Sequence, residues 1–75
     1  MNANKLKGKI VEQGLSIAKV ADLIGMHRSS LYRKINGHEK MTVAEAIKLK
    51  NILGLTDLEA LDIFLSRGDD SGAAL

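Results

Sequence analysis

The chain has 75 residues, of which 45% are hydrophobic and 27% charged, and it contains no cysteine. A chain of this length builds one modest core without a separate substrate domain, so neither an enzyme nor a small-molecule substrate is expected. Without cysteine there are no disulfides or thiolate metal sites, and no apolar run approaches the roughly 18 residues of a membrane span. We therefore expect a cytoplasmic protein with no membrane segment and no cofactor.

Charge is divided unevenly along the chain. Residues 1–50 hold ten Lys or Arg and four acids, whereas residues 51–75 hold one Arg and five acids. The two parts carry formal charges of +6 and −4, which give the net charge of +2. A basic first part is expected of a surface that meets phosphates, with ordinary surface solvation as the alternative.

Regularly spaced glycines predict helix ends, and five helices are expected between them. The first runs from about residue 5 to 13, with Leu6 and Ile10 one turn apart. Ser16 is a candidate N-cap for the second helix, because its hydroxyl can accept from a free N–H of the first turn. The inward side of that helix comprises Ile17, Val20, Ala21 and Ile24.

The segment from Ser16 to Gly37 has the spacing of a helix-turn-helix. Ala21 leaves room where two helices cross, and Gly25 supplies the positive φ that a sharp turn between them requires. Leu31 then anchors a third helix, which begins near His27 or Arg28 and ends before Asn36 and Gly37. Its buried side is completed by Ile35.

Two capping boxes predict where the last two helices begin, at Thr42 with Glu45 and at Thr56 with Glu59. For the fourth helix we expect an apolar face of Val43, Ile47 and Leu53, flanked by Ala46 and Leu49. For the fifth we expect a core stripe of Leu58, Leu61, Phe64 and Leu65. Residues 67–75 have no packed pattern, so a domain over residues 1–66 is followed by a flexible C-terminal tail.

The outward side of the third helix is the candidate surface for reading bases. It carries Arg28, Ser29, Tyr32 and Arg33. Arginine forks can grip O6 and N7 of guanine together, and a serine hydroxyl can contact several base edges. With two aromatic residues in the chain, a stacking platform for single strands is not available, so duplex DNA is the expected partner. The Tyr32 ring could contact DNA or lie over the helix as packing.

Other polar residues are candidates for phosphate contacts. Ser16 and Lys19 lie in the first turn of the second helix, where free N–H groups favour an anion. Asn36, His38 and Lys40 form a polar loop after the third helix, and His27 either caps that helix or contacts a phosphate. Because the two histidines have no carboxylate or cysteine partners at ligand spacing, no metal site is expected, and no residues have a catalytic arrangement.

At VADLIGMHRSSLYRKING, residues 20–37, the chain resembles the Cro and CI repressor family of phages, also called Xre-type helix-turn-helix regulators. This resemblance implies an all-α fold, a compact five-helix lambda-repressor-like domain that binds operator DNA as a homodimer, at least on DNA. It implies base contacts from the four outward residues, and Ser16, Asn36 and Lys40 match phosphate-contact positions. The family often has an apolar residue three after the anchor, where this chain has Lys34, so Lys34 becomes a further phosphate candidate.

Ile63 lies outside the core stripe and is a candidate for a dimer contact, with an ordinary single exposed apolar residue as the alternative. The sequence thus predicts a double-stranded DNA-binding transcriptional regulator, a Cro-like phage or prophage repressor that is nucleoid-associated when bound. The alternative is a protein-interaction module, such as an antitoxin or anti-repressor acting through the fifth helix.

Overall fold

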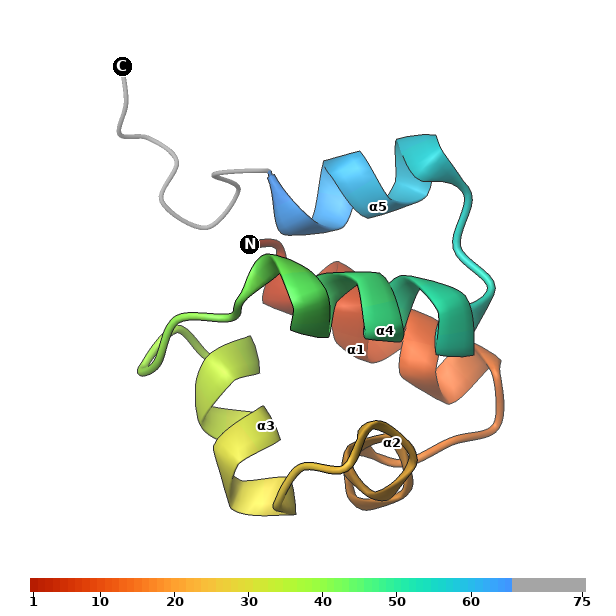
Figure 1. Cartoon of the computed structure of the whole chain (residues 1–75). Coiled ribbons are helices and arrows are strands. Elements are labelled where there is room, and N and C mark those ends of the chain that lie inside the picture. Colours follow the sequence, from red (N-terminus) through yellow and green to blue (C-terminus); the bar gives the residue numbers. More distant parts are fainter. Residues whose placement is uncertain (66–75) are drawn as a thin grey trace.

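The computed structural model describes residues 1–65, and the predicted tail at 67–75 lies outside them. Five α-helices follow one another in this part of the chain (Figure 1): α1 (Ala3–Glu12), α2 (Ile17–Ile24), α3 (Arg28–Ile35), α4 (Val43–Leu53) and α5 (Asp57–Phe64). The predicted all-α fold and the order of its helices are confirmed. Within the described part, no helix has the length and apolar character needed to cross a membrane.

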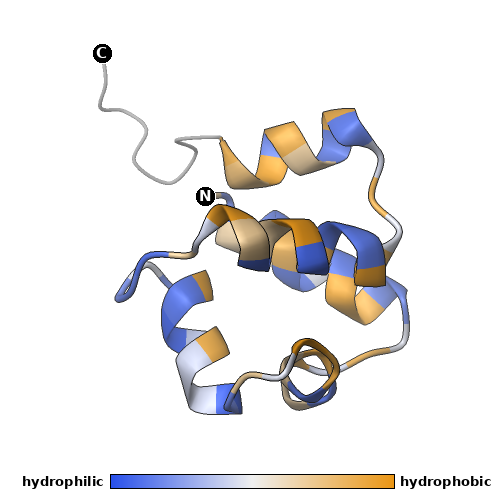
Figure 2. Cartoon of the chain, viewed as in Figure 1, coloured by the Kyte–Doolittle hydropathy of each residue, from blue (hydrophilic) through white to orange (hydrophobic). Residues whose placement is uncertain are grey.

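In the view of Figure 1, α5 lies above the level of α1 and α4, and α2 and α3 lie below it. The α2 helix packs against α3 and α4, and α1 packs against α2 and α5. Every helix contributes apolar side chains to one core. Figure 2 marks the hydrophobic residues of each helix in orange. Its buried members are Leu6, Ile10, Val20, Ala21, Ile24, Leu31, Ile35, Leu49, Leu53, Leu55 and Ile63. The α3 segment is otherwise polar, so one thin apolar side holds it to the core.

The turn between α2 and α3 is formed as the spacing predicts. Gly25 has a φ of 75°, in the left-handed region that favours glycine, and the next N–H, of Met26, donates to the Ala21 carbonyl at 2.8 Å. Ala21 and Leu31 are 1% and 0% exposed, so the small residue and the anchor both lie where the helices meet. These contacts establish the helix-turn-helix.

Side chains fix where the helices begin. The Ser16 hydroxyl accepts from the Lys19 N–H, and both predicted capping boxes are present, at Thr42 with Glu45 and at Thr56 with Glu59. Each cap satisfies N–H groups that have no partner within the helix, which is typically worth about 1 kcal/mol. The sequence therefore located these helix starts correctly.

The predicted apolar face of α4 is confirmed at Leu53 but wrong at Val43 and Ile47. Val43 and Ile47 are 77% and 52% exposed, and the buried residues are Leu49 and Leu53, one turn apart. The packed side of α4 instead continues toward Glu45, whose carboxylate is held by Lys34 of α3. Because Glu45 is charged, the sequence pattern did not indicate that this side of α4 packs against the rest of the domain.

The predicted core stripe of α5 is wrong for the same reason. Ile63 is fully buried, while Leu58, Leu61 and Leu65 are exposed, and Phe64 is half-buried. The acids around Ile63 lie at the contact with α1, because Glu59 and Asp62 form ion pairs with Lys9 and Lys5 of that helix, although the Asp62 side chain stays half exposed. Ile63 therefore has no surface to offer a dimer partner.

Candidate nucleic-acid interface

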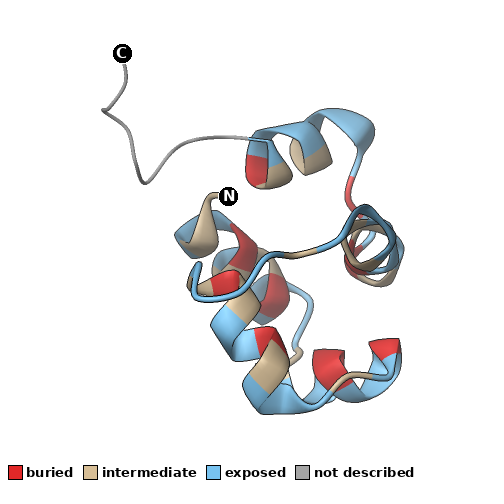
Figure 3. Cartoon of the chain, turned by 60° about the vertical axis from the view of Figure 1, so that its left-hand side comes forward, coloured by how far each residue is buried: buried red, intermediate tan, exposed pale blue. Residues whose placement is uncertain are grey.

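The α3 helix has one buried side and one fully accessible side. Leu31 and Ile35 are buried in the core. Figure 3 marks the buried positions of the chain in red and the exposed ones in pale blue. The accessible side carries the four predicted base-reading residues Arg28, Ser29, Tyr32 and Arg33, which are all exposed. Their predicted exposure is confirmed, so together they form the outward surface of the second helix of the helix-turn-helix.

The two arginines of α3 differ in their surroundings. Within residues 1–65, Arg28 has no ion-pair partner, whereas the Arg33 Nε lies 3.5 Å from an oxygen of Glu39. Both side chains of this second pair are well exposed, at 60% and 41%, so solvent screens the interaction and it contributes little stability. Each guanidinium is therefore accessible to an incoming ligand.

Tyr32 contacts a residue that sequence reasoning missed. Tyr32 is 53% exposed, and the Lys7 ammonium of α1 lies over its ring, 5.8 Å from the ring centroid. Lys7 also donates to the Asn36 Oδ1 at 3.0 Å. This bond leaves the Asn36 amide N–H groups available as donors, beside the remaining N–H groups of Lys7. No local signal in the sequence connects residue 7 with residues 32 and 36, because the tertiary fold brings them together.

The polar groups at the starts of α2 and α3 are partly used as caps. The Ser16 Oγ accepts from the Lys19 N–H at 3.1 Å, while the Lys19 side chain is exposed. His27 caps α3, because its Nδ1 accepts from the Ser29 N–H at 3.3 Å and lies 2.8 Å from the Ser29 hydroxyl. Of the two predicted roles for His27, capping is therefore the one that the geometry supports.

Lys34 does not present its charge to solvent. Its ammonium lies 2.8 Å from both carboxylate oxygens of Glu45, and the Lys34 side chain is 13% exposed. This hydrogen bond, together with one from the Thr42 N–H, lowers the pKa of Glu45. The expectation that Lys34 reaches backbone phosphates therefore disagrees with its position, and the structure gives it a role in joining α3 to α4.

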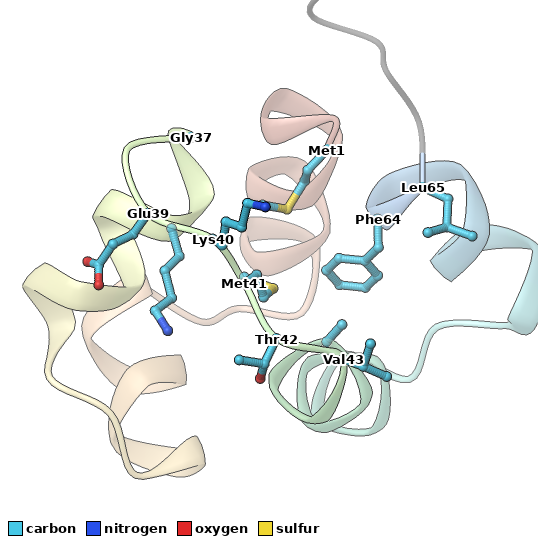
Figure 4. Close-up of a pocket in the computed structure, with 11 residues that line it drawn as sticks. Met1, Gly37, Glu39, Lys40, Met41, Thr42, Val43, Phe64 and Leu65 are labelled. Atoms are coloured by element: carbon cyan, nitrogen blue, oxygen red, sulfur yellow. The ribbon is translucent and has the colours of Figure 1, made fainter.

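The loop between α3 and α4 exposes His38 and Lys40. It also forms one wall of a pocket of about 330 Å³, whose other walls come from Met1, the start of α4 and the end of α5 (Figure 4). The pocket is lined by polar residues, among them Glu39 and Lys40, and by the apolar side chains of Met41, Val43 and Phe64. Nothing in this set resembles a metal site, and no group of three possible ligands occurs in residues 1–65.

Ion pairing explains the uneven charge of the sequence. The acids of α5 neutralise lysines of α1 and α4, in the pairs Lys5–Asp62, Lys9–Glu59 and Lys50–Asp57. Among the described cationic side chains, five have no ion pair: Lys7, Lys19, Arg28, Lys40 and Lys48. Lys7 contacts α3, Lys19 and Arg28 lie on the two helices of the motif, and Lys40 follows α3. Much of the uncompensated positive charge therefore surrounds α3.

The fold and this basic, polar surface define a helix-turn-helix DNA-binding domain. A family model described as helix-turn-helix matches residues 6–61. The chain is also 36% identical over 66 residues, or 88% of its length, to an Aeropyrum pernix protein with the name of an HTH-type transcriptional regulatory protein. It spans 20% of the length of that relative. No solved structure matches the chain.

The chain therefore belongs to the helix-turn-helix family, in the Xre and Cro/CI group that its residues 20–37 resemble. Members of this class are DNA-binding transcription regulators.

Proposed function

We propose that the protein is a sequence-specific repressor of the Cro-like type, encoded by a phage or prophage and bound to operator DNA in the cytoplasm. The main support for this proposal is the exposed side of α3. The exposed side of α3 consists of Arg28, Ser29, Tyr32 and Arg33, while the opposite side is locked into the core. A helix held in this way can enter a major groove without deforming.

In this proposal, α3 reads base edges directly. Arg28 and Arg33 each offer a planar fork for O6 and N7 of guanine, and Arg33 exchanges its exposed Glu39 contact for the base. Tyr32 lies between them on the same side of the helix. Occupation of the operator then blocks transcription by occlusion.

Phosphate contacts flank the reading helix. The first turn of α2 offers Lys19 and the Ser16 cap, and the loop after α3 offers His38 and Lys40. We add Lys7, since its ammonium and the Asn36 amide lie side by side at the end of α3 and present several N–H donors to one phosphate. Lys34 is removed from this set because Glu45 occupies its ammonium.

We propose that the second half-site is bound by a second copy of the chain, joined through the α4–α5 side. An apolar groove of about 430 Å³ lies there, with Ile47, Leu61 and Leu65 among its lining residues. Its rim carries Lys50 and Asp57, 3.1 Å apart, so a two-fold arrangement could set each cation against the partner's anion. This groove lies away from α3, which leaves both reading helices accessible. The two α3 helices of the dimer would then bind two operator half-sites about 34 Å apart.

The test is selection of binding sites from a random duplex library, followed by comparison of two variants at fixed salt. Arg28→Ala should weaken binding to the selected site by roughly 5- to 160-fold, which corresponds to about 1–3 kcal/mol, with little effect on random duplex. Lys40→Ala should weaken both duplexes alike. A palindromic site supports the dimer as well. Failure to enrich any site would contradict sequence-specific binding and favour the protein-interaction module.

Lys7 has a matched control on its own helix. Lys7→Ala should lower the slope of log affinity against log salt by about one, because one phosphate contact is lost. Lys5→Ala should leave the slope unchanged, since Lys5 pairs with Asp62 on the α5 side of the molecule. Equal slopes for the two variants would show that Lys7 makes no phosphate contact.

A further inference from the structure

An open hollow of about 350 Å³ lies on the reading surface, between the first turn of α2 and the exposed side of α3. It is lined by Ile17, Ala18, Arg28, Ser29 and Tyr32. Three of these five are the outward residues of α3 described above, so the hollow belongs to the surface that would face the major groove. Ile17 is half-buried and Ala18 is exposed.

The hollow combines an apolar α2 side with a mostly polar α3 side. Ile17 and Ala18 contribute only hydrocarbon side chains, and the Tyr32 ring adds an apolar surface, whereas the surrounding α3 residues are polar. Apolar surface gains free energy only when another apolar group covers it. In the major groove of DNA, base edges offer hydrogen-bond donors and acceptors, and the apolar group among them is the C5-methyl of thymine.

We propose that this hollow binds the C5-methyl group of a pyrimidine, and that it does so beside a guanine contacted by Arg28. The inference rests on the proposed function, because it requires α3 to lie in the major groove. It goes further by naming one chemical feature of the operator. The same methyl group occurs in thymine and in 5-methylcytosine, and both present it at the same position of the groove.

The neighbouring side chains favour a methyl group over a polar base edge. Arg28 and Ser29 offer polar atoms on the α3 side of the hollow, whereas the α2 side offers none from side chains. Because the Ser29 hydroxyl lies 2.8 Å from the His27 Nδ1, it is already engaged with a partner. A base edge that placed a donor or acceptor against Ile17 and Ala18 would lose its hydrogen bond to water without replacement.

The experiment uses the full chain and the duplex obtained by selection. Each thymine in turn is replaced by deoxyuridine, which lacks only the methyl group. One position in each half-site should lose about fourfold in affinity, which corresponds to the ~0.8 kcal/mol expected for one buried methyl or methylene group. At that position, duplexes with 5-methylcytosine and with cytosine, each paired to guanine, are then compared. If the duplex with 5-methylcytosine binds about fourfold more tightly than the duplex with cytosine, the hollow also binds the methyl group of 5-methylcytosine. If the two duplexes bind equally, the hollow is specific for thymine.

A variant that fills the hollow provides the protein half of the test. Ala18→Leu places a larger side chain in the hollow at an exposed helical position, so folding should be unaffected. It should abolish the preference for thymine over deoxyuridine. Ala44→Leu makes the same change at an exposed alanine of α4 that does not line the hollow, and should retain the preference.

Failure of this inference and failure of the proposed function give different results. If Arg28→Ala loses its preference for the selected site but no thymine position responds to deoxyuridine, the methyl site is wrong and sequence-specific binding stands. The methyl site is also wrong if Ala18→Leu keeps the full thymine preference. If no site is selected at all, both proposals are overturned.

Discussion

The ammonium of Lys34 lies 2.8 Å from both carboxylate oxygens of Glu45, and this pair joins the end of α3 to the first turn of α4. Both side chains are mostly buried, at 13% and 22% exposed, and Glu45 also completes a capping box with Thr42. The reading helix is thus fixed at its C-terminal end by a contact that does not itself face DNA.

We predict that Lys34→Met destabilises the fold without weakening general DNA affinity. The methionine keeps much of the aliphatic stem but removes the ion pair, so the free energy of unfolding should fall by about 1 kcal/mol. Urea denaturation measures this loss, and titration with random duplex measures the affinity. Lys40→Ala should show the opposite pattern: its free energy of unfolding should be unchanged, and its affinity for random duplex should be lower. Should Lys34→Met weaken random-duplex binding as Lys40→Ala does, Lys34 would be a phosphate contact after all.

Two glycines provide a matched test of the turn. Gly25 has a φ of 75°, whereas Gly8 lies inside α1 and does not have a positive φ. In both cases an added Cβ would have no atom within 4 Å, so steric crowding does not distinguish them. Gly25→Ala should lower the free energy of unfolding by roughly 1–2 kcal/mol, because alanine is strained in the left-handed backbone conformation. Gly8→Ala should instead stabilise the protein by about 0.5–1 kcal/mol. Chemical denaturation of both variants checks the sign, and a stabilising Gly25→Ala would contradict the turn geometry.

The sequence predicted the start of each helix from α2 onward better than it predicted which side of a helix is buried. Caps and turns depend on residues three or four apart, such as Thr42 with Glu45, and these local signals were sufficient. Orientation failed in α4 and α5, where each capping-box glutamate lies one turn before a buried residue: Glu45 before Leu49, and Glu59 before Ile63. A carboxylate on the packed side resembles a solvent face until its lysine partner is known.

Those partners lie on other helices and are far apart in sequence. Lys9 is 50 residues from Glu59, and Lys7 is 29 residues from Asn36, so no periodicity or spacing rule links them. The exposed side of α3 was predictable because Leu31 and Ile35 alone define its buried side. The exposed side of α3 could therefore be predicted from the sequence, but the contact of Lys7 with this surface could not.

The corrected orientation of α5 separates stability from association. Ile63 is fully buried, so Ile63→Ala should cost about 2–5 kcal/mol of unfolding free energy through lost contacts and a cavity. Leu61 is 51% exposed and lines the α4–α5 groove, so Leu61→Glu should leave the stability of the monomer nearly unchanged. It should, however, weaken the dimer and the cooperative binding of two half-sites.

Sedimentation at several concentrations, with and without operator duplex, measures this association. Val11→Glu is the control, because Val11 is 73% exposed on α1 and does not line the groove. A wild-type chain that stays monomeric on a two-half-site duplex would contradict the dimer. An equal loss of association in both glutamate variants would place the interface elsewhere.

Glu59 makes the stability of the fold sensitive to acid. The hydrogen bond from Lys9, at 2.8 Å, and the bond from the Thr56 N–H lower the pKa of Glu59 from its ordinary value of 4.5 to about 2. Because the folded state binds this proton less readily than the unfolded chain, the stabilisation is complete above about pH 4.5. It is lost as the pH falls toward about 2. Glu45, whose pKa is lowered in the same direction, adds to the effect.

We therefore predict that Glu59→Gln is less stable than the wild type at neutral pH and loses less stability on acidification. Thermal unfolding at pH 6 and pH 3 measures both differences. The amide can still accept a hydrogen bond but carries no charge and gains no proton in this range, so the two proteins should converge at low pH. The remaining acid sensitivity of the variant is expected from Glu45. Asp22→Asn is the control, because Asp22 is exposed and has no ion pair within residues 1–65. If Asp22→Asn reduced the acid sensitivity as much as Glu59→Gln, the ion pair between α1 and α5 would not be its source.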